Sequence, residues 1–352
     1  MRQRAVRHGF WGPDMQSNVC IFTKIVHVAS GKEIDPGLLQ EGTYIEALSL
    51  DSPKLMLVLR DHGSYLQNQL RLQEFDELSV SLGDTWREDG VSSQETFVVL
   101  TSRPMPDGTV RLNCLAKSVF DMKKIADRTR VFNQRGVQEI AAAFAGGLKR
   151  SIGQFAVVEN YHCIAGERPT TMLRQLAEEQ GAHAWVARGT FHLRKFAELL
   201  AQDPAMTFHY ATMDSGFPIL KYTRPSTQMH LQESAIRSFT GWNETLGRVK
   251  TSSSIPFLAG AKSTPPMITG AAAPYVLGNK PVTKQTAIDF VTLGNLSITP
   301  GQLAKLVWHL PDPENPIDEG LPERVVIESV AHWYSSQKYY CRVKGAVALE
   351  PR

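Results

Sequence analysis

The sequence predicts a β-rich α+β fold in which two β-barrel domains flank a small α/β block. Short apolar runs separated by turn signals fill residues 18–122, and helical spacing first becomes prominent within residues 123–208. Alternating apolar and polar residues return over residues 209–352. The chain has 352 residues, which is more than one hydrophobic core usually serves, so several domains are expected.

The first expected barrel, residues 18–122, contains strands with regular alternation. In the segment DELSVSLGD, Leu78, Val80 and Leu82 fall on one face of a strand. The segment PDG at 106–108 predicts a hairpin turn, because proline presets φ and glycine accepts a positive φ. A basic arm, residues 1–17, precedes this domain, and no apolar stretch of the kind found in secretory signals follows its arginines.

The block at residues 123–208 reads as helix, strand, helix and hairpin. We expect the first helix in RGVQEIAAAFAGGLKR, where apolar residues from Val137 to Leu148 fall at helical spacing, and a strand in FAVVENYHCIAG. The second helix should begin at Pro169, which suits a first turn, and end at Gly181, which suits the position after a helix. The hairpin should turn at Arg188 and Gly189.

The second expected barrel, residues 209–352, ends in a long hairpin that turns near Ser336. It also contains a long loop, residues 251–285, that is rich in proline, glycine, serine, threonine and alanine. Irregular segments of this length are uncommon inside compact domains and are often functional or ordered by a partner. We hypothesise that this loop reaches a neighbouring subunit or another partner through Phe257, Pro265, Pro266 and Tyr275.

Residues that could carry catalysis, a cofactor or a metal are scarce. The sequence has no phosphate-binding loop, dinucleotide fingerprint, HExxH motif or nucleophile elbow. His183 and His192 flank the hairpin turn, but two imidazoles without an acidic or cysteine ligand make a poor zinc site. Cys163 follows His162 directly, and strand alternation points their side chains apart. We therefore predict no catalytic residue, no cofactor and no metal site.

The middle block resembles the hub domain of contractile injection machines. This group comprises the VgrG spike of type VI secretion, the phage late control D family and the baseplate hub of contractile phage tails. The resemblance is clearest over residues 130–195. It follows a helix in RVFNQRGVQEIAAAF, a polar step, an LxEExG-like helix end and an aromatic hairpin. The matching residues, which we expect to be scaffold, are Val137, Ile140, Glu167, Leu173, Leu176, Glu178, Gly181, Trp185, Gly189 and Phe191.

The resemblance implies a structural protein of the virion, made in the host bacterial cytoplasm, and not an enzyme. Such hubs are homotrimers with two tube-type β-barrel domains in each chain, so that three chains offer six positions to a sixfold tail tube. A spike binds the threefold side, and since no repetitive β-helix follows residue 352, we expect a separate spike protein. Other baseplate proteins are expected partners, and the resemblance leaves open whether DNA or a tape-measure protein passes through the channel.

Three other functions are alternatives to the contractile hub. A tail-tip hub of a non-contractile tail would have the same general architecture. A tail-associated cell-wall hydrolase would need a carboxylate pair or a cysteine–histidine pair in a cleft, and Cys163 beside His162 is the one local candidate. A nucleic-acid-binding barrel is disfavoured, because the formal net charge is only +3.

Overall fold

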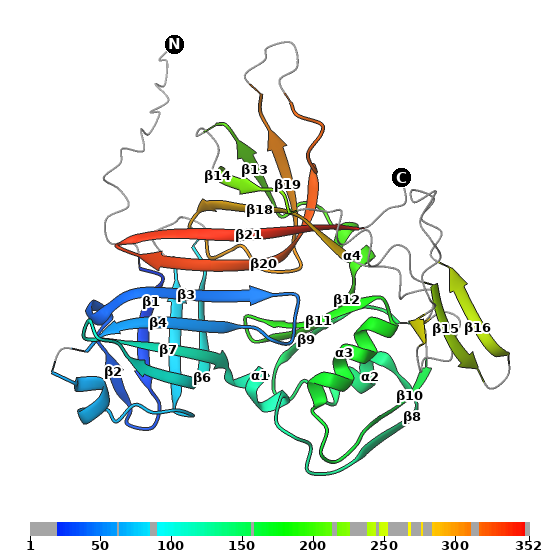
Figure 1. The fold of residues 1–352 in the computed structure, drawn as a ribbon, viewed down its shortest axis with the longest axis horizontal. Helices are drawn as coiled ribbons and strands as arrows, with labels where there is room; N and C mark the ends of the chain where they lie inside the picture. The colour runs from blue at the N-terminus through cyan, green and yellow to red at the C-terminus, as the bar shows by residue number, and fades with distance from the viewer. Residues whose placement is uncertain are drawn as a thin grey trace, which may run out of the picture.

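The computed structural model describes residues 20–61, 63–84, 90–155, 158–212, 217–225, 238–243, 246–252, 267–268, 276, 284–310 and 317–348. In Figure 1 a β-barrel lies at the top, a strongly curved sheet at the lower left and an α/β block at the lower right. A helix both long and apolar enough to cross a membrane does not occur in the described part of the chain.

The curved sheet contains seven antiparallel strands in the order β3-β4-β7-β6-β5-β1-β2. Alternation places Leu78, Val80 and Leu82 of β5 in the core, as their spacing predicts. The short helical turns η2 (Pro36–Leu38) and η3 (Tyr65–Gln69) join strands at its rim. The strands are β1 (Phe22–His27), β2 (Lys32–Ile34), β3 (Leu39–Ala47), β4 (Lys54–Arg60), β5 (Glu77–Gly83), β6 (Ser92–Pro104) and β7 (Thr109–Ala116).

Side-chain packing fills the gap between β3, at one end of this curved sheet, and β1, near its other end. Phe22 of β1 is fully buried, and its ring lies directly over Gly42 of β3. A Cβ at position 42 would lie 2.2 Å from the ring, so only glycine allows this approach. The described strands β1 and β3 therefore meet through an aromatic contact and not through a hydrogen-bonded ladder.

The second β unit is a closed barrel of six strands, in the order β19-β13-β14-β18-β21-β20 with β20 returning to β19. Its ladders are antiparallel except for the two that involve β13, which pairs in parallel with β14 and β19. The strands are β13 (Met206–Tyr210), β14 (Pro218–Thr223), β18 (Lys284–Leu293), β19 (Leu303–Trp308), β20 (Arg324–Ser335) and β21 (Lys338–Ala348).

Strand β20 belongs to both units, because its two halves use one edge for different partners. Residues 324–326 pair with β19 and close the barrel, whereas residues 329–335 pair with β3 of the curved sheet. The opposite edge pairs with β21 along most of its length. One continuous 13-stranded sheet therefore runs through both β units.

The α/β block contains two small sheets and four short helices. The antiparallel pair β8–β10 forms one sheet, and β9, β12 and β11 form the other, with β9 parallel to β12. The helices are α1 (Lys117–Met122), α2 (Val137–Ala142), α3 (Pro169–Glu179) and α4 (Phe196–Leu200). The strands are β8 (Arg130–Gly136), β9 (Lys149–Ile152), β10 (Val158–Cys163), β11 (Ala182–Ala187) and β12 (Thr190–Lys195).

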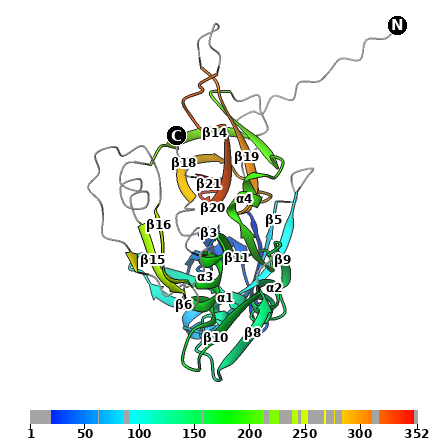
Figure 2. The same ribbon diagram turned by 90° about the vertical axis from the view of Figure 1, so that its right-hand side faces the viewer.

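A further small sheet lies beside the block and consists of β15 (Ser238–Asn243), β16 (Gly247–Ser252) and β17 (Met267–Ile268). Its described strands pair only with one another. Figure 1 shows the β15–β16 hairpin at the right-hand end of the molecule, and in Figure 2 it lies at the left-hand side of the fold.

The predicted β-rich α+β class, with barrel architecture and few helices, is confirmed. The helix that the resemblance implies in RVFNQRGVQEIAAAF is wrong in its first half, because residues 130–136 form β8 and only 137–142 form α2. Arginine, asparagine and glutamine tolerate a helix, but pairing with β10 prevails here over local preference. The boundary expected between residues 208 and 209 falls inside β13, and the proposed arm at 1–17 lies outside the described residues.

Candidate functional site

The ten residues of the sequence signature all lie in the described α/β block. Gly181, with a φ of 61°, follows α3, and Gly189, with a φ of 68°, lies in the turn between β11 and β12. Glu167 and Glu178 are exposed. The six buried members are Val137 and Ile140 on α2, Leu173 and Leu176 on α3, and Trp185 and Phe191 on the hairpin.

Trp185 connects the block to the closed barrel. Its side chain is buried, and a Cβ at Gly301, just before β19, would lie 2.6 Å from the ring. Its cross-strand partner His192 stacks on the same ring, with the centroids 4.6 Å apart. This contact belongs to a small second core that joins the block to both β units: Leu48, Trp185, Ala187, Phe196, Leu199, Leu303, Val326 and Ala346.

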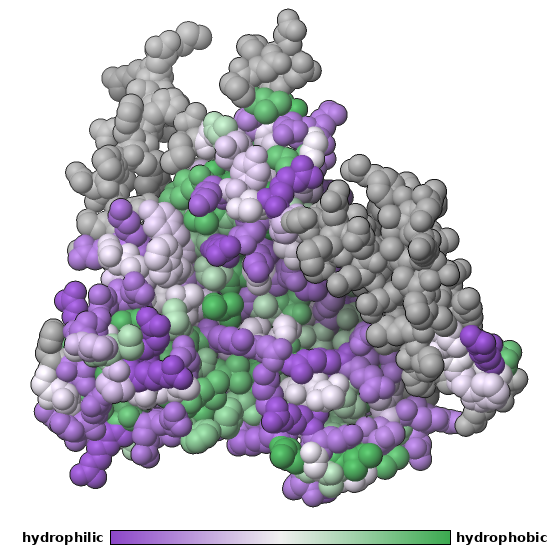
Figure 3. Space-filling model, viewed as in Figure 1, coloured by the Kyte–Doolittle hydropathy of each residue, from purple (hydrophilic) through white to green (hydrophobic). Residues whose placement is uncertain are grey.

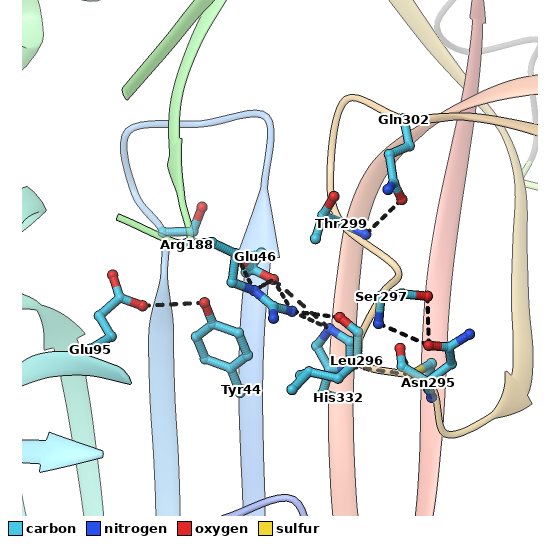
Figure 4. A network of polar contacts seen from close by, with 12 residues as sticks. Tyr44, Glu46, Glu95, Arg188, Asn295, Leu296, Ser297, Thr299, Gln302 and His332 are labelled. Atoms are coloured by element: carbon cyan, nitrogen blue, oxygen red, sulfur yellow. Dashed lines mark hydrogen bonds and ion pairs between the residues drawn. The ribbon is translucent and has the colours of Figure 1, made fainter. Parts of the chain in front are cut away.

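Arg188, in the turn of the same hairpin, makes a buried ion pair with Glu46 of β3 (Figure 4). The Nε–H of Arg188 donates to both carboxylate oxygens of Glu46, at 3.0 and 2.9 Å. Its Nη2 also donates to the carbonyl oxygen of Leu296, 3.0 Å away in the loop between β18 and β19. One side chain therefore connects the α/β block, the curved sheet and the closed barrel.

Leu296 is bound at both of its backbone groups. Arg188 donates to its carbonyl, and the Oδ2 of Asp84, at the end of β5, accepts from its N–H at 2.8 Å. Asp84 is itself buried and also accepts from the N–H of Val91 at 2.6 Å. The loop between β18 and β19 is thus held to the curved sheet by a second charged group.

His332 of β20 completes the network from the side of the closed barrel. Its Nε2 lies 3.5 Å from Nη2 of Arg188, and its Nδ1 lies 2.7 Å from the hydroxyl of Tyr339. Burial and the charge of Arg188 lower the pKa of His332 well below its ordinary value. The imidazole is therefore neutral, so Nε2 can accept from Arg188 while Nδ1 donates to Tyr339. We call Glu46, Asp84, Arg188, Leu296 and His332 the junction network.

Glu95 of β6 lies next to the junction network. It accepts a hydrogen bond of 3.2 Å from the hydroxyl of Tyr44, whose ring lies 5.4 Å from the guanidinium of Arg188. Burial and the nearby charge of Glu46 raise the pKa of Glu95 to about 8. Glu95 also forms part of the wall of a surface cavity of about 560 Å³ between β6, α1 and the turn after α2, which gives it access to solvent protons.

The same region holds a cysteine and a histidine in contact, but they cannot act as a nucleophilic pair. Sγ of Cys341 lies 3.2 Å from Nδ1 of His332, and both residues are fully buried. Burial raises the pKa of the Cys341 thiol to about 11, so it stays protonated at neutral pH. A protonated thiol beneath a closed sheet packs as a small apolar side chain.

The candidate site residues from the sequence do not assemble into a catalytic or metal site. Cys163 is buried and the adjacent His162 is exposed, so their side chains point apart as alternation predicts. Burial lowers the pKa values of both His183 and His192 to about 4, with Lys284 and Arg194 adding to the respective effects. No group of three or more metal-ligating side chains occurs among the described residues. The loop residues Phe257, Pro265, Pro266 and Tyr275 lie outside the described residues.

The sequence does not predict the junction network, although it contains one signal of a buried charge. In the segment YIEALSL, Glu46 is in phase with Tyr44, Leu48 and Leu50, and all four side chains are buried. A carboxylate in the buried phase of a strand requires a buried partner. That partner, Arg188, is 142 residues away and sits in a turn, so sequence spacing alone could not identify it.

We predict that Arg188→Met lowers the free energy of unfolding by about 3–5 kcal/mol, because it leaves the charge of Glu46 buried without a partner. The double variant Arg188→Met with Glu46→Gln should be more stable than the single variant. A matched control is Arg342→Met, which removes the bidentate partner of Asp289; the Arg342 side chain is 65% exposed, so its loss should cost about 1 kcal/mol or less. Chemical denaturation measures all three; equal losses for Arg188→Met and Arg342→Met would contradict the prediction.

We also predict that Glu95→Gln reduces the pH dependence of stability. The pKa of Glu95 is about 8 in the folded chain, above the ordinary 4.5, so the folded state holds a proton that the unfolded state releases. The raised pKa of Glu95 therefore lowers the free energy of unfolding as pH rises from about 4.5 to about 8. The decrease is at most about 1.4 kcal/mol per pH unit. Unfolding midpoints measured across this range should fall less steeply in Glu95→Gln, and an unchanged slope would count against the assignment.

Solved structures of tail proteins share this fold. A tail protein from Neisseria meningitidis MC58 has a TM-score of 0.63 at 10% identity, over 92% of this chain and 95% of that chain. The 43 kDa tail protein of prophage MuSo2 from Shewanella oneidensis has a TM-score of 0.60 at 13% identity, over 92% and 96%. The prophage tail protein gp18 from Listeria monocytogenes EGD-e has a TM-score of 0.51 at 9% identity, over 94% of both chains.

Sequence comparison alone does not find this likeness. No family model matches the chain, and no curated protein matches it. At identities of 9–13% the similarity concerns the fold, and it extends over nearly the whole length of each partner. The chain therefore has the fold of these tail proteins, with its two β units and its α/β block included.

Proposed function

We propose that this chain is a structural hub of a contractile phage tail baseplate. In this proposal it forms a homotrimer that joins the sixfold tail tube to a threefold spike during assembly and injection. One observation carries the proposal: β20 divides one edge between β19 and β3, so two β units are fused within a single chain. The fold shared with solved tail proteins supports it.

The proposal follows from symmetry. Three chains with two β units each would present six similar positions around one axis, which is what a sixfold tube needs. The junction network would hold the two units of each chain at a fixed angle, so that all six positions can be matched at once. The opposite side of the ring keeps threefold symmetry and would receive a separate spike protein.

The work of such a hub is mechanical. No bond is made or broken, and closed symmetry with large buried interfaces would transmit force between tube and spike. In this proposal the protein resides in the virion, other baseplate proteins bind its periphery, and the central channel faces DNA or a tape-measure protein. The loop at 251–285, with Phe257, Pro265, Pro266 and Tyr275, would reach a neighbouring subunit.

The proposal predicts a trimer in solution. Native mass spectrometry and sedimentation of the full chain over a range of concentrations should reveal a species of three times the 39.1 kDa chain mass. That species should bind purified tail tube protein in a ratio of three hub chains to six tube chains. A stable dimer or tetramer, or a trimer that binds three tube chains, would contradict the proposed symmetry match.

A further inference from the structure

Two aromatic side chains of the described chain are mostly exposed. Trp242 on β15 is 68% exposed and Phe75, in the turn before β5, is 67% exposed, the highest values among the large hydrophobic residues described. Aromatic side chains of this kind often anchor protein interfaces. Neither residue belongs to the junction network. The ring of Phe75 lies 6.3 Å from that of Phe120 on α1, and this contact still leaves most of Phe75 exposed.

Phe75 is held outward by its backbone. Its φ of 72° lies in the left-handed region, where a bulky residue is strained. The turn keeps this conformation because the N–H of Phe75 donates to the carbonyl of Val99 at 2.7 Å, and the N–H of Val99 donates to the carbonyl of Asp76 at 2.9 Å. Strain that the surrounding structure maintains is commonly found at functional positions. The backbone hydrogen bonds of the turn therefore keep Phe75 exposed.

The surface around Phe75 is apolar and includes Phe120 of α1, whose basic neighbours Lys117 and Lys124 are ion-paired with Glu77 and Asp121. Val28 and Leu100 are 46% and 37% exposed, and both adjoin the turn through the backbone, since the N–H of Val28 bonds to Glu77 and Val99 precedes Leu100. Glu74, directly before Phe75, is exposed and has no ion pair with a described residue. We call Val28, Glu74, Phe75 and Leu100 the Phe75 patch.

Among the described residues, the charged neighbour of Trp242 is basic. Arg248 of β16 is the cross-strand partner of Trp242 and is exposed, without an ion pair to a described residue. In Figure 3 apolar and strongly polar side chains lie next to each other at the right-hand end of the molecule, where this hairpin is found. An aromatic anchor with an arginine beside it complements an apolar patch with a carboxylate beside it.

The two surfaces lie far apart within one chain. Figure 1 places the β15–β16 hairpin at the right-hand end, beside the α/β block, and the curved sheet that carries the Phe75 patch on the left. Another exposed apolar pair, Ile125 and Val131, is a poorer match, because its exposed neighbours Asp127 and Arg128 carry opposite charges and offer no net charge to complement Arg248. The complementary surfaces can therefore meet only between two copies of the chain.

We infer that the β15–β16 hairpin of one copy docks on the Phe75 patch of the next copy, with Trp242 against Phe75 and Arg248 against Glu74. This contact joins two different surfaces, and such head-to-tail contacts generate rings when the rotation closes. The inference rests on the proposed homotrimer and names the contact that would close it. Both surfaces become partly buried in the assembled ring, which accounts for their exposure in the single chain.

Sedimentation of full-length variants tests this contact. Trp242→Ser and Phe75→Asn should each weaken self-association about tenfold or more, because each removes an interface anchor. Asparagine tolerates the positive φ at position 75, so this variant should remain folded, as circular dichroism would verify. Val131→Ser, at an aliphatic residue that is 64% exposed and lies outside the inferred contact, is the matched control and should assemble like the unaltered chain.

A mixing experiment distinguishes this head-to-tail contact from general destabilisation. Trp242→Ser keeps the Phe75 patch and Phe75→Asn keeps the hairpin, so a mixture of the two should form heterodimers at concentrations where each alone is monomeric. Likewise, Arg248→Glu and Glu74→Arg should each weaken assembly, and the double variant should regain it. Absence of both the heterodimer and the charge rescue would overturn the contact.

The outcomes separate this contact from the function on which it rests. If the unaltered chain forms a trimer and the Trp242→Ser and Phe75→Asn variants assemble equally well, the docking contact is wrong and the hub proposal stands. If the unaltered chain forms no trimer at any concentration, alone or with tube protein, both are wrong.

Discussion

The architecture depends on how strand β20 satisfies its backbone hydrogen bonds. A strand has two edges, and β20 gives one to β21 and divides the other between β19 and β3. At the transition, Ile327 exchanges backbone hydrogen bonds with Gly301 and Gln302, and the carbonyl of Glu328 accepts from Leu48. The ladder therefore passes from the barrel to the curved sheet with these groups bonded, and the two units cannot separate without exposing them.

The junction network adds charged groups to this backbone connection. Buried charges are costly unless they are paired, so Glu46 and Arg188 stabilise only the arrangement in which all three parts of the chain meet. A relative rotation of the two β units would separate Arg188 from Leu296 or from Glu46. We therefore interpret the network as a device that fixes one angle between the units, which is what a symmetric ring of similar positions would require.

The sequence contained the fold class and much of the local structure, because these follow from periodicity and turn chemistry. Periodicity and turn chemistry predict the alternation in β5, the end of α3 at Gly181 and the hairpin turns at Gly189 and Ser336. They do not predict the strand at 130–136, since its state depends on pairing with β10 rather than on its own composition. The sequence alone could not predict the junction network either, because Glu46, Arg188 and His332 are distant in sequence and meet only through the topology.

In the proposed hub, the two β units of each chain act as equivalent positions around one axis. Electron cryomicroscopy of the purified particle, reconstructed without imposed symmetry, tests this most directly. The account predicts threefold symmetry overall, with six β units spaced at about 60° on the face that binds the tube. A ring in which only one β unit of each chain lies on that face would contradict it.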